Sequence, residues 1–350
     1  MKRKKKSGSK KLALTALVCV LSVVLVALLG ATFYVDWVLD KFYYDADENE
    51  QTLSSQQLEE LLTQPDETID PTAVTVDPDE LVWGDAKPIE SANHIYNILL
   101  VGQDRRPGEI RARSDSMILV TVNTETKQVT LTSIMRDMYV QIPGFGSNRM
   151  NVPYAIKGAE LLFDTMEKNF GLRPDKFVEV DFNGFTKAVE LVGGVDIYLT
   201  AAEARHLNTT EEGYDYPEED WHLTEGINHL DGKQALAFAR CRSVDGTGDF
   251  SRTRRQRDVL RALLEKAATL NPLELNQLVL AMSEYITTDM TSEEIIGYAV
   301  TFAPLLAELQ IVNMRIPADN SFYMANIDGV GSVLVPDLEK NRAILAATQN

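Results

Sequence analysis

The chain has 350 residues, of which 45% are apolar and 25% are charged, and its formal net charge is −18 at pH 7. This composition excludes a disordered chain, and the length suits one or two folded domains. Cys19 and Cys241 are the only cysteines, which excludes a disulfide-rich scaffold and a thiolate metal site.

The N-terminus predicts a membrane anchor. Residues 1–11 carry seven Lys or Arg and no acid, and residues 12–35 then run for 24 residues without a charge. At about 1.5 Å per residue this helix reaches roughly 36 Å, enough to cross a hydrocarbon core of about 30 Å. A cleaved signal peptide is the alternative, but its apolar region is usually only about 7 to 15 residues long. We expect a cytoplasmic tail, one transmembrane helix in the cell membrane and, by the positive-inside rule, an extracytoplasmic remainder.

Residues 36–93 predict an acidic extracytoplasmic stalk. From residue 45 to residue 93 the chain holds fourteen acids against one Lys, and four prolines interrupt it. A short helix fits at residues 53–62, before Pro65 limits it. We interpret the whole segment as a solvated spacer that lifts a folded domain, residues 94–350, away from the lipid headgroups.

The acidic charge of the outer part argues against a nucleic-acid partner. Of the 34 Lys and Arg, seven lie in the tail, which leaves 27 against 52 Asp and Glu. Phosphate contacts supply most non-specific affinity for duplex DNA, so a chain this acidic binds it poorly unless its basic residues cluster. They do cluster, as described below, but within a small site.

Strands and helices alternate through residues 94–350. The apolar run NILLVG from residue 97 predicts a buried strand, and residues 117–123 and 128–135 predict a hairpin rich in β-branched residues. Further strands are expected at 176–182, 195–199 and 311–317, and helices at 152–169, 185–191, 232–239, 251–270, 272–283, 292–308 and after 336. This alternation predicts an α/β fold, a three-layer α-β-α sandwich around a mixed central sheet.

Charged residues stand at the ends of three predicted strands. Asp104 follows the first strand directly, and Arg113 and Asp115 lead into the second. Arg136 and Asp137 leave the third strand. Any one of these is more often a solvated charge or a local ion pair, but open α/β sheets bind ligands at strand ends. Together they indicate a binding site.

A fourth segment, residues 239–257, carries six arginines, among them Arg240 and Arg242. In the helix expected here, stepping back by four along the apolar stripe from Leu260 reaches Gln256 and Arg252. These two side chains are therefore expected to point inward.

The other arginines of this helix are expected to differ in burial. Arg254 and Arg257 lie off the apolar stripe and should be solvated, whereas Arg255 borders it. An inward guanidinium needs a partner, which is Asp245, Asp249, an aspartate of the strand ends or an anionic ligand. A purely structural network of arginines and aspartates is the alternative to a site.

Clustered arginines predict an anionic ligand, because the planar guanidinium donates two parallel hydrogen bonds to phosphate and stays charged. Four or five of them suit a pyrophosphate. Asp104 and Asp115 would repel that ligand unless a divalent cation bridges them, so charge balance makes them candidate ligands for Mg²⁺ (or Mn²⁺). Cys241 has no neighbouring His in sequence and is interpreted as a small filler residue.

Read in order, the motifs resemble the LytR-CpsA-Psr family of cell-envelope proteins over roughly residues 97–264, and the membrane anchor also fits. The matching motifs are GQDRR, RSDSMILVTVN, SIMRDMYVQIPG, NRMNVPYAIKGAE, FNGF followed by LVGGVDI, GINHLDGKQALAFARCR and DFSRTRRQRDVL. The resemblance implies a phosphotransferase that moves a glycopolymer from an undecaprenyl-pyrophosphate carrier to a peptidoglycan hydroxyl. Wall teichoic acid and capsular or related polysaccharides are the cargo that the family implies.

The resemblance also implies roles for single residues. Asp104 and Asp115 resemble the Mg²⁺-associated aspartates of the family. The residues that resemble the pyrophosphate-binding set of the family are Arg113, Arg136, Arg240, Arg242, Arg252 and Gln256. Arg149 is included because it stands where a lysine is common in the family. We expect Arg136, Asp137 and Arg252 to carry catalysis, with Asp104 or Asp137 assisting deprotonation. Met135 stands where the family usually has proline, a departure that removes no charge.

Three alternatives stay open at this point. The domain could bind polyprenyl phosphates or wall polymer without transfer, or it could act as a pyrophosphatase with water as the acceptor. A transcriptional attenuator is the third, although the tail of eleven residues is far below the roughly 40 residues that a domain needs without staples. The oligomeric state and the polymer are not specified by the sequence.

Overall fold

The computed structural model describes residues 43–44, 53–63, 70–81, 83–84, 86–103, 111–209, 221–242 and 244–350. These residues belong to one unit that begins at Tyr43. The predicted tail and transmembrane helix, residues 1–35, lie outside the described residues. Among the helices that are described, none is both long and apolar enough to cross a membrane.

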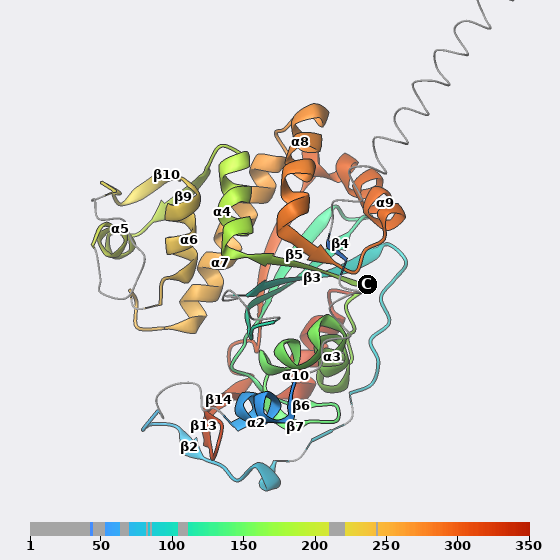
Figure 1. Ribbon diagram of the computed structural model, residues 1–350, viewed down its shortest axis with the longest axis vertical. Helices are drawn as coiled ribbons and strands as arrows, with labels where there is room; N and C mark the ends of the chain where they lie inside the picture. The colour runs from blue at the N-terminus through green and yellow to red at the C-terminus, as the bar shows by residue number, and fades with distance from the viewer. Residues whose placement is uncertain are drawn as a thin grey trace, which may run out of the picture. The chain divides into compact units, whose positions relative to one another are not determined.

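A seven-stranded mixed sheet forms the centre of this unit (Figure 1). Its strands, in spatial order, are β1 (Tyr43–Tyr44), β11 (Ile286–Thr288), β8 (Lys176–Asp181), β3 (Ile95–Gln103), β4 (Ser114–Asn123), β5 (Gln128–Ile134) and β12 (Gln310–Ile316). β3 runs antiparallel to β4 and parallel to β8, and β12 runs parallel to β5. The prediction of a mixed central sheet is therefore confirmed.

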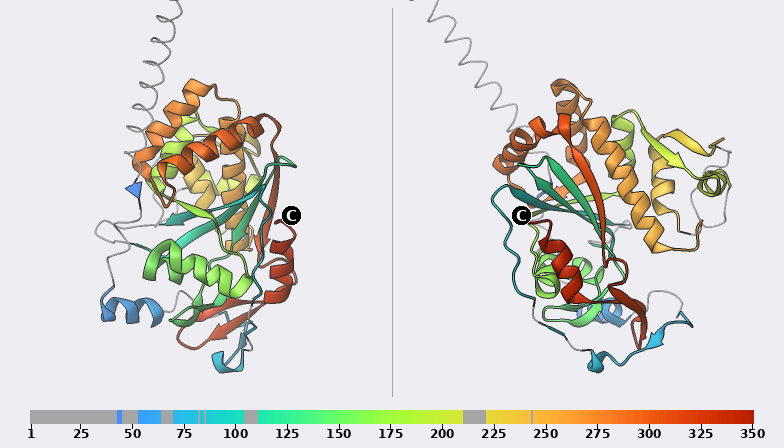
Figure 2. Two further views of the ribbon diagram at one scale, coloured as in Figure 1. Left: turned by 90° about the vertical axis from the view of Figure 1, so that its right-hand side faces the viewer. Right: turned by 180° about the vertical axis from the view of Figure 1, so that it is seen from behind.

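Helices cover both faces of the sheet (Figure 2). They are α2 (Ser55–Thr63), α3 (Val152–Phe170), α4 (Phe182–Leu191), α5 (Ala201–Asn208), α6 (Gly232–Arg240), α7 (Asp249–Ala267), α8 (Pro272–Met282), α9 (Ser292–Phe302) and α10 (Leu338–Ala346). Smaller sheets pair β9 (Val195–Leu199) with β10 (Gly226–Leu230), β6 (Tyr139–Ile142) with β7 (Gly146–Arg149), and β13 (Phe322–Ile327) with β2 (Val74–Thr75) and β14 (Gly331–Pro336).

Successive side chains of β4 point to opposite faces of the sheet and belong to two separate hydrophobic cores. Met117 and Leu119 point to one face, where they pack in a cluster with Phe163 of α3. Ile118 points to the other face, where it packs in a cluster with Leu260 of α7. β4 therefore buries both faces, which explains its nearly continuous apolar sequence, and the helices on the two sides of the sheet make the architecture three-layered.

Part of the predicted stalk is packed against the domain. The helix expected at residues 53–62 is present as α2, and its Leu58, Leu61 and Leu62 contact a cluster that includes Ile156 of α3. β2 adds a strand to β13. The prediction of a free spacer is wrong for these segments, because the leucines at i, i+3 and i+4 form an apolar stripe that needs a partner surface.

α7 is buried on two faces, which corrects the expected burial of its arginines. Leu260 faces the sheet, whereas Val259 packs in a second cluster with β9 and α6. Arg257, expected to be solvated, is only 8% exposed, and Arg255 is fully buried. Arg254 is exposed as expected, with 45% of its side chain accessible. The apolar stripe of this helix predicted only the face that contacts the sheet to be buried. The second buried face is largely polar and gave no such signal.

Arg255 ties α7 to α5 and to the segment after α6. Its Nε donates to Glu203 Oε1 at 2.8 Å and its Nη2 to Asp245 Oδ2 at 3.0 Å. Its Nη1 donates to the carbonyl oxygen of Cys241 at 2.9 Å, so the buried cysteine sits beside this network. The network fixes the segment that carries Arg240 and Arg242.

Arg255→Met is expected to lower the free energy of unfolding by about 3 kcal/mol, because it leaves the buried Glu203 with one ionic partner fewer. Urea unfolding of the full chain measures this change. Arg261→Met is the matched control, since Arg261 lies on the same helix in an exposed pair with Glu265 and should cost less than about 0.5 kcal/mol. Equal effects in the two variants would contradict the account.

Candidate active site

A cavity of about 600 Å³ lies between the sheet and helices α4, α6, α7 and α8. Its apolar lining comprises Leu100, Val101, Ile118, Val178, Val180, Phe182, Phe185, Ala188, Leu236, Ala239, Leu260, Leu263 and Met282. Its polar lining comprises Asp115, Ser116, Asp181, Arg240, Arg242, Arg252 and Gln256. A concave site that combines an apolar wall with a few basic groups suits an amphiphile with an anionic head.

Strand register gathers the polar groups at one edge of the sheet. Gly102 lies opposite Ser116 on β4 and opposite Val180 on β8, so Asp115 and Asp181 reach the same edge. The apolar residues of the same strands lie further from these strand ends, where Leu100 is opposite Ile118. The prediction that charges at strand ends converge is therefore confirmed for Asp115.

Arg136 and Asp249 connect the two halves of the site. Arg136 Nη1 donates to Asp115 Oδ1 at 2.7 Å, and its Nε donates to Asp249 Oδ2 at 2.9 Å. Asp249 Oδ2 also accepts from Arg252 Nη2 at 2.8 Å, and Arg242 Nε lies 3.5 Å from Asp249 Oδ1. Asp249 was expected only as a possible partner of buried arginines, and it proves to be the centre of the network.

The charges of Arg136 and Arg252 are balanced differently. Burial alone would lower the pKa of Arg136, but Asp137, Asp249 and Asp115 outweigh it and raise the pKa. For Arg252, burial followed by the neighbouring Arg136 lowers the pKa to about 10, against the opposing charge of Asp249. Its Nε is also buried without a hydrogen-bond partner among the described residues. The aspartates therefore leave part of the Arg252 charge available to an anionic ligand.

Two further predicted residues lie at the rim of the cavity. The Arg240 guanidinium stacks over the ring of Phe182, 4.6 Å from its centroid, which fixes its direction. Gln256 accepts a hydrogen bond from Ser116 Oγ at 3.1 Å. With Arg242 and Arg252, these residues make the basic part of the cavity, and the expected inward direction of Arg252 and Gln256 is confirmed.

Arg136, predicted to bind pyrophosphate, does not line the cavity and instead pairs with Asp115 and Asp249. Arg113 and Arg149, predicted to bind the same group, do not line it either. Arg113 Nη2 donates to the carbonyl oxygen of Leu61 at 2.9 Å and so helps to hold α2. Arg149 is 4% exposed, and its Nη2 donates to the carbonyl oxygen of Ser332 at 2.8 Å. Both guanidinium groups bind backbone carbonyls instead. Asp104, the other predicted metal ligand, lies outside the described residues.

Asp137 and Asp249 form a hydrogen-bonded pair with opposite pKa shifts. Burial raises the pKa of Asp137 to about 6, against the charge of Arg136. Burial would also raise the pKa of Asp249, but Arg252 and Arg136 outweigh it and lower the pKa to about 2. Between these values the shared proton resides on Asp137, so the pair carries one negative charge and fixes Arg136.

Asp137→Asn is expected to gain stability relative to the unmodified chain as the pH rises from 4.5 to 7.5. The unfolded chain releases this proton near pH 3.9, whereas the folded chain holds it to about pH 6. The stabilisation from this group is therefore complete below about pH 4 and is lost as the pH rises through about 6. Urea unfolding across this pH range tests the expectation, with the exposed Asp328→Asn as control. Parallel pH profiles for all three chains would argue against the shared proton.

A metal site made only of protein side chains is not found in the described ranges, where no three His, Cys, Asp or Glu side chains converge suitably. The side chain of Asp115 is 34% exposed, and only its Oδ1 is engaged by Arg136. Mg²⁺ commonly uses one or two carboxylates and takes further oxygens from water and substrate phosphates. Asp115 at the cavity rim is consistent with that mode of binding.

Comparisons with known proteins agree on one family. The model described as the LytR_cpsA_psr family matches residues 42–347. TagU of Bacillus cereus (strain AH820), a polyisoprenyl-teichoic acid–peptidoglycan teichoic acid transferase, is 32% identical over 252 residues, which cover 71% of this chain and 77% of TagU. The regulatory protein MsrR of Staphylococcus aureus (strain COL) is 29% identical, covering 73% of this chain and 74% of MsrR. The solved structure of TagT bound to LIIa-WTA superposes with a TM-score of 0.58 at 25% identity, covering 73% of this chain and 91% of that chain.

Proposed function

The chain belongs to the LytR-CpsA-Psr family and is a phosphotransferase, and we propose that it transfers a glycopolymer from an undecaprenyl-pyrophosphate carrier to a peptidoglycan hydroxyl. Wall teichoic acid, a capsular polysaccharide or a related polymer is the cargo. The observation that carries this proposal is the cavity whose apolar wall adjoins a rim of arginines. The name of TagU, a teichoic acid transferase, supports the same class of substrate.

The cavity accounts for both parts of a lipid-linked donor. The prenyl chain lies along the apolar lining, where each buried methylene contributes about 0.8 kcal/mol. The pyrophosphate lies at the rim, where Arg240, Arg242 and Arg252 donate charge-assisted hydrogen bonds. We infer that the phosphorus atom that carries the glycan lies on the solvent side of these arginines, where a large acceptor has access.

Catalysis then rests on positioning and electrostatics. The acceptor hydroxyl attacks the phosphorus atom attached to the glycan and releases its proton to water, a new phosphodiester forms, and the bond to the lipid phosphate breaks. Negative charge grows on the leaving lipid phosphate, and the incompletely balanced Arg252 offsets it. Arg136 binds Asp115 and Asp249 and so orients both sides of the site. Asp137 does not line the cavity, and its Oδ2 lies 3.7 Å from Arg136 Nε, so we assign it the positioning of Arg136.

We propose Mg²⁺ (or Mn²⁺) as the cofactor, with Asp115 and Asp104 as its protein ligands. When bound, the cation would neutralise charge on the phosphate oxygens. We also propose that residues 12–35 anchor the chain in the cell membrane with the catalytic domain outside. The uncharged length of that segment and the seven basic residues before it support this orientation.

The proposal is tested with the full chain in detergent, supplied with a glycan linked to undecaprenyl pyrophosphate, Mg²⁺ and peptidoglycan. We expect polymer attached to peptidoglycan through a phosphodiester, released lipid phosphate, and a strong fall in rate when EDTA removes the cation. Free glycan phosphate formed at the same rate with and without peptidoglycan would instead identify a pyrophosphatase. Donor binding with no product at all would identify a carrier-binding protein.

A regulatory role is the second candidate, and the relative named regulatory protein MsrR is the observation that favours it. Changes in gene expression on deletion of the chain would be expected in either case, because a defective wall also triggers responses. A variant such as Arg252→Gln separates the two: a purely regulatory protein keeps its effect on expression when transfer is lost.

A further inference from the structure

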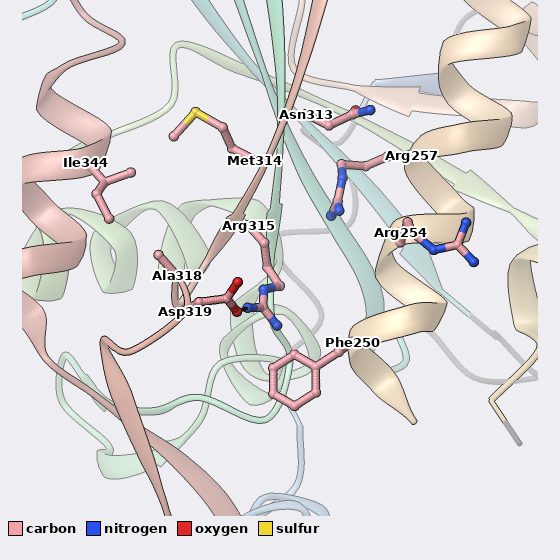
Figure 3. Close-up of a pocket in the computed structure, with 9 residues that line it drawn as sticks. All are labelled: Phe250, Arg254, Arg257, Asn313, Met314, Arg315, Ala318, Asp319 and Ile344. Atoms are coloured by element: carbon pink, nitrogen blue, oxygen red, sulfur yellow. Dashed lines mark hydrogen bonds and ion pairs between the residues drawn. The ribbon is translucent and has the colours of Figure 1, made fainter. Parts of the chain in front are cut away.

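Figure 3 shows a second pocket, of about 490 Å³. The residues of α7 that line it lie on a different face of the helix from those that line the apolar cavity. Phe250, Arg254 and Arg257 line it from α7, and Arg315 lines it from the edge strand β12. Its remaining lining residues are Asn313, Met314, Ala318, Asp319 and Ile344. The pocket is thus rich in arginine and shares no lining residue with the cavity assigned to the donor lipid.

Arg257 is a buried cation without a complete set of partners. It is 8% exposed, its Nη1 donates to Ser133 Oγ at 2.5 Å, and its Nε has no hydrogen-bond partner among the described residues. Burial, and then the charges of Arg315 and Arg254, lower its pKa to about 10, while Asp258 opposes them. A buried charge without full compensation is costly, so an anion in the pocket would stabilise the Arg257 guanidinium by balancing its charge.

Arg315 is held toward the same pocket. Its guanidinium lies 4.4 Å from the ring centroid of Phe250, which in turn stacks on Phe322. Its Nη2 donates to Asp319, whose side chain is 89% exposed. An exposed carboxylate is a weak counter-ion, because water screens the pair and competes for it.

Arg254 is not part of the proposed site, since Figure 3 shows its guanidinium directed away from Arg315. It is paired with Glu203 and Asp258 at 2.7 Å each. Two cations, Arg257 and Arg315, therefore face the pocket against one lining carboxylate, Asp319. The pocket is positively charged although the chain as a whole is strongly acidic.

We propose that Arg257 and Arg315 bind one phosphate group of an anionic polymer, and that this phosphate displaces Asp319. Two guanidinium groups match the hydrogen-bonding capacity of a phosphate at any physiological pH. The volume exceeds that of a phosphate and leaves room for the sugar or polyol that carries it. The existence of an anion site stands on these contacts alone, whereas its assignment to the transferred polymer rests on the proposed function.

The consequence is a preference for charged cargo. A polymer with repeating phosphates engages the donor cavity through its pyrophosphate and this pocket through a later unit, which raises its effective affinity. An uncharged polysaccharide engages only the first. Because the two sites lie on different faces of α7, loss of the second weakens the binding of polymer and leaves the chemistry at the first unchanged.

Thermal unfolding of the full chain in the presence of inorganic phosphate or of a glycerol phosphate oligomer tests this inference, because a ligand that binds the folded chain raises Tm. The measurements use an Arg252→Gln background, which weakens the first site. In that background we expect Arg257→Gln or Arg315→Gln to weaken oligomer binding about 10-fold. Asp319→Asn removes the competing carboxylate and should tighten binding several-fold.

Asp319→Asn keeps the test decisive even if Arg257→Gln fails to fold, because Asp319 is exposed and an increase in affinity cannot arise from damage to the fold. Unchanged binding in Arg315→Gln and Asp319→Asn would overturn the anion site. A response to inorganic phosphate without a response to the oligomer, or stronger binding of a glutamate oligomer, would overturn the assignment to a phosphate polymer. Binding is read without turnover, so this outcome is independent of the transfer assay.

Discussion

Arg252→Gln is expected to lower the rate of glycopolymer transfer at least 100-fold while the chain stays folded. Arg252 is buried at the cavity rim, and Asp249 balances its charge only in part. Removing one preorganised donor from the position where charge develops commonly costs about 100-fold to 1000-fold. Initial rates of polymer attachment to peptidoglycan, at saturating lipid-linked donor, measure the loss.

Two matched variants sharpen this prediction. Arg252→Lys keeps a positive charge but loses the planar fork, so its rate should lie between those of the unmodified chain and Arg252→Gln. Arg261→Gln changes an exposed arginine of the same helix and should leave the rate unchanged. Equal rates for Arg252→Gln and Arg261→Gln would exclude the arginine rim as the pyrophosphate site.

Ala188→Phe is expected to lower kcat/KM for the undecaprenyl-linked donor by about 15-fold. Ala188 lines the apolar cavity from α4, and a phenyl ring there occupies space assigned to the prenyl chain. Displacing two methylenes at about 0.8 kcal/mol each costs about 1.6 kcal/mol, which corresponds to about 15-fold in affinity.

A donor with a short, soluble lipid provides the internal control for Ala188→Phe, because its chain does not reach the blocked part of the cavity and its kcat/KM should be unchanged. Ala299→Phe adds the same ring to an exposed position on α9 and should affect neither donor. Equal losses with long and short lipids would mean that the substitution damages the site and does not report on the prenyl chain.

Five of the seven strands of the central sheet could be predicted because they are rich in apolar and β-branched residues and are bounded by turn residues. β3, β4, β5, β8 and β12 all follow this pattern. β1 and β11 have two and three residues, too few for any periodicity. β10, with the sequence GINHL, exposes Ile227 and lacks a run of apolar residues.

The inward direction of Arg252 and Gln256 could be predicted from the helical period, because Gln256 lies about one turn and Arg252 about two turns before Leu260. Their partners could not be predicted in this way, because Arg136 and Asp249 are 113 positions apart in sequence and meet only through tertiary packing. The apolar lining drawn from α4, α6 and α8 depends on packing in the same way. The burial of Arg257 was predicted wrongly, because a polar helix face carries no sequence signal of burial, and Arg257 is covered by the sheet, where it binds Ser133 of β5.

The most direct test is a crystal structure of the full chain with a glycan phosphonate analogue of the undecaprenyl-pyrophosphate donor. We predict that oxygen atoms on both phosphorus atoms lie within hydrogen-bonding distance of Arg240, Arg242 or Arg252. We also predict that prenyl carbons lie in the cavity beside Leu260. A prenyl chain bound outside this cavity, with the phosphorus groups away from these arginines, would contradict the proposed site.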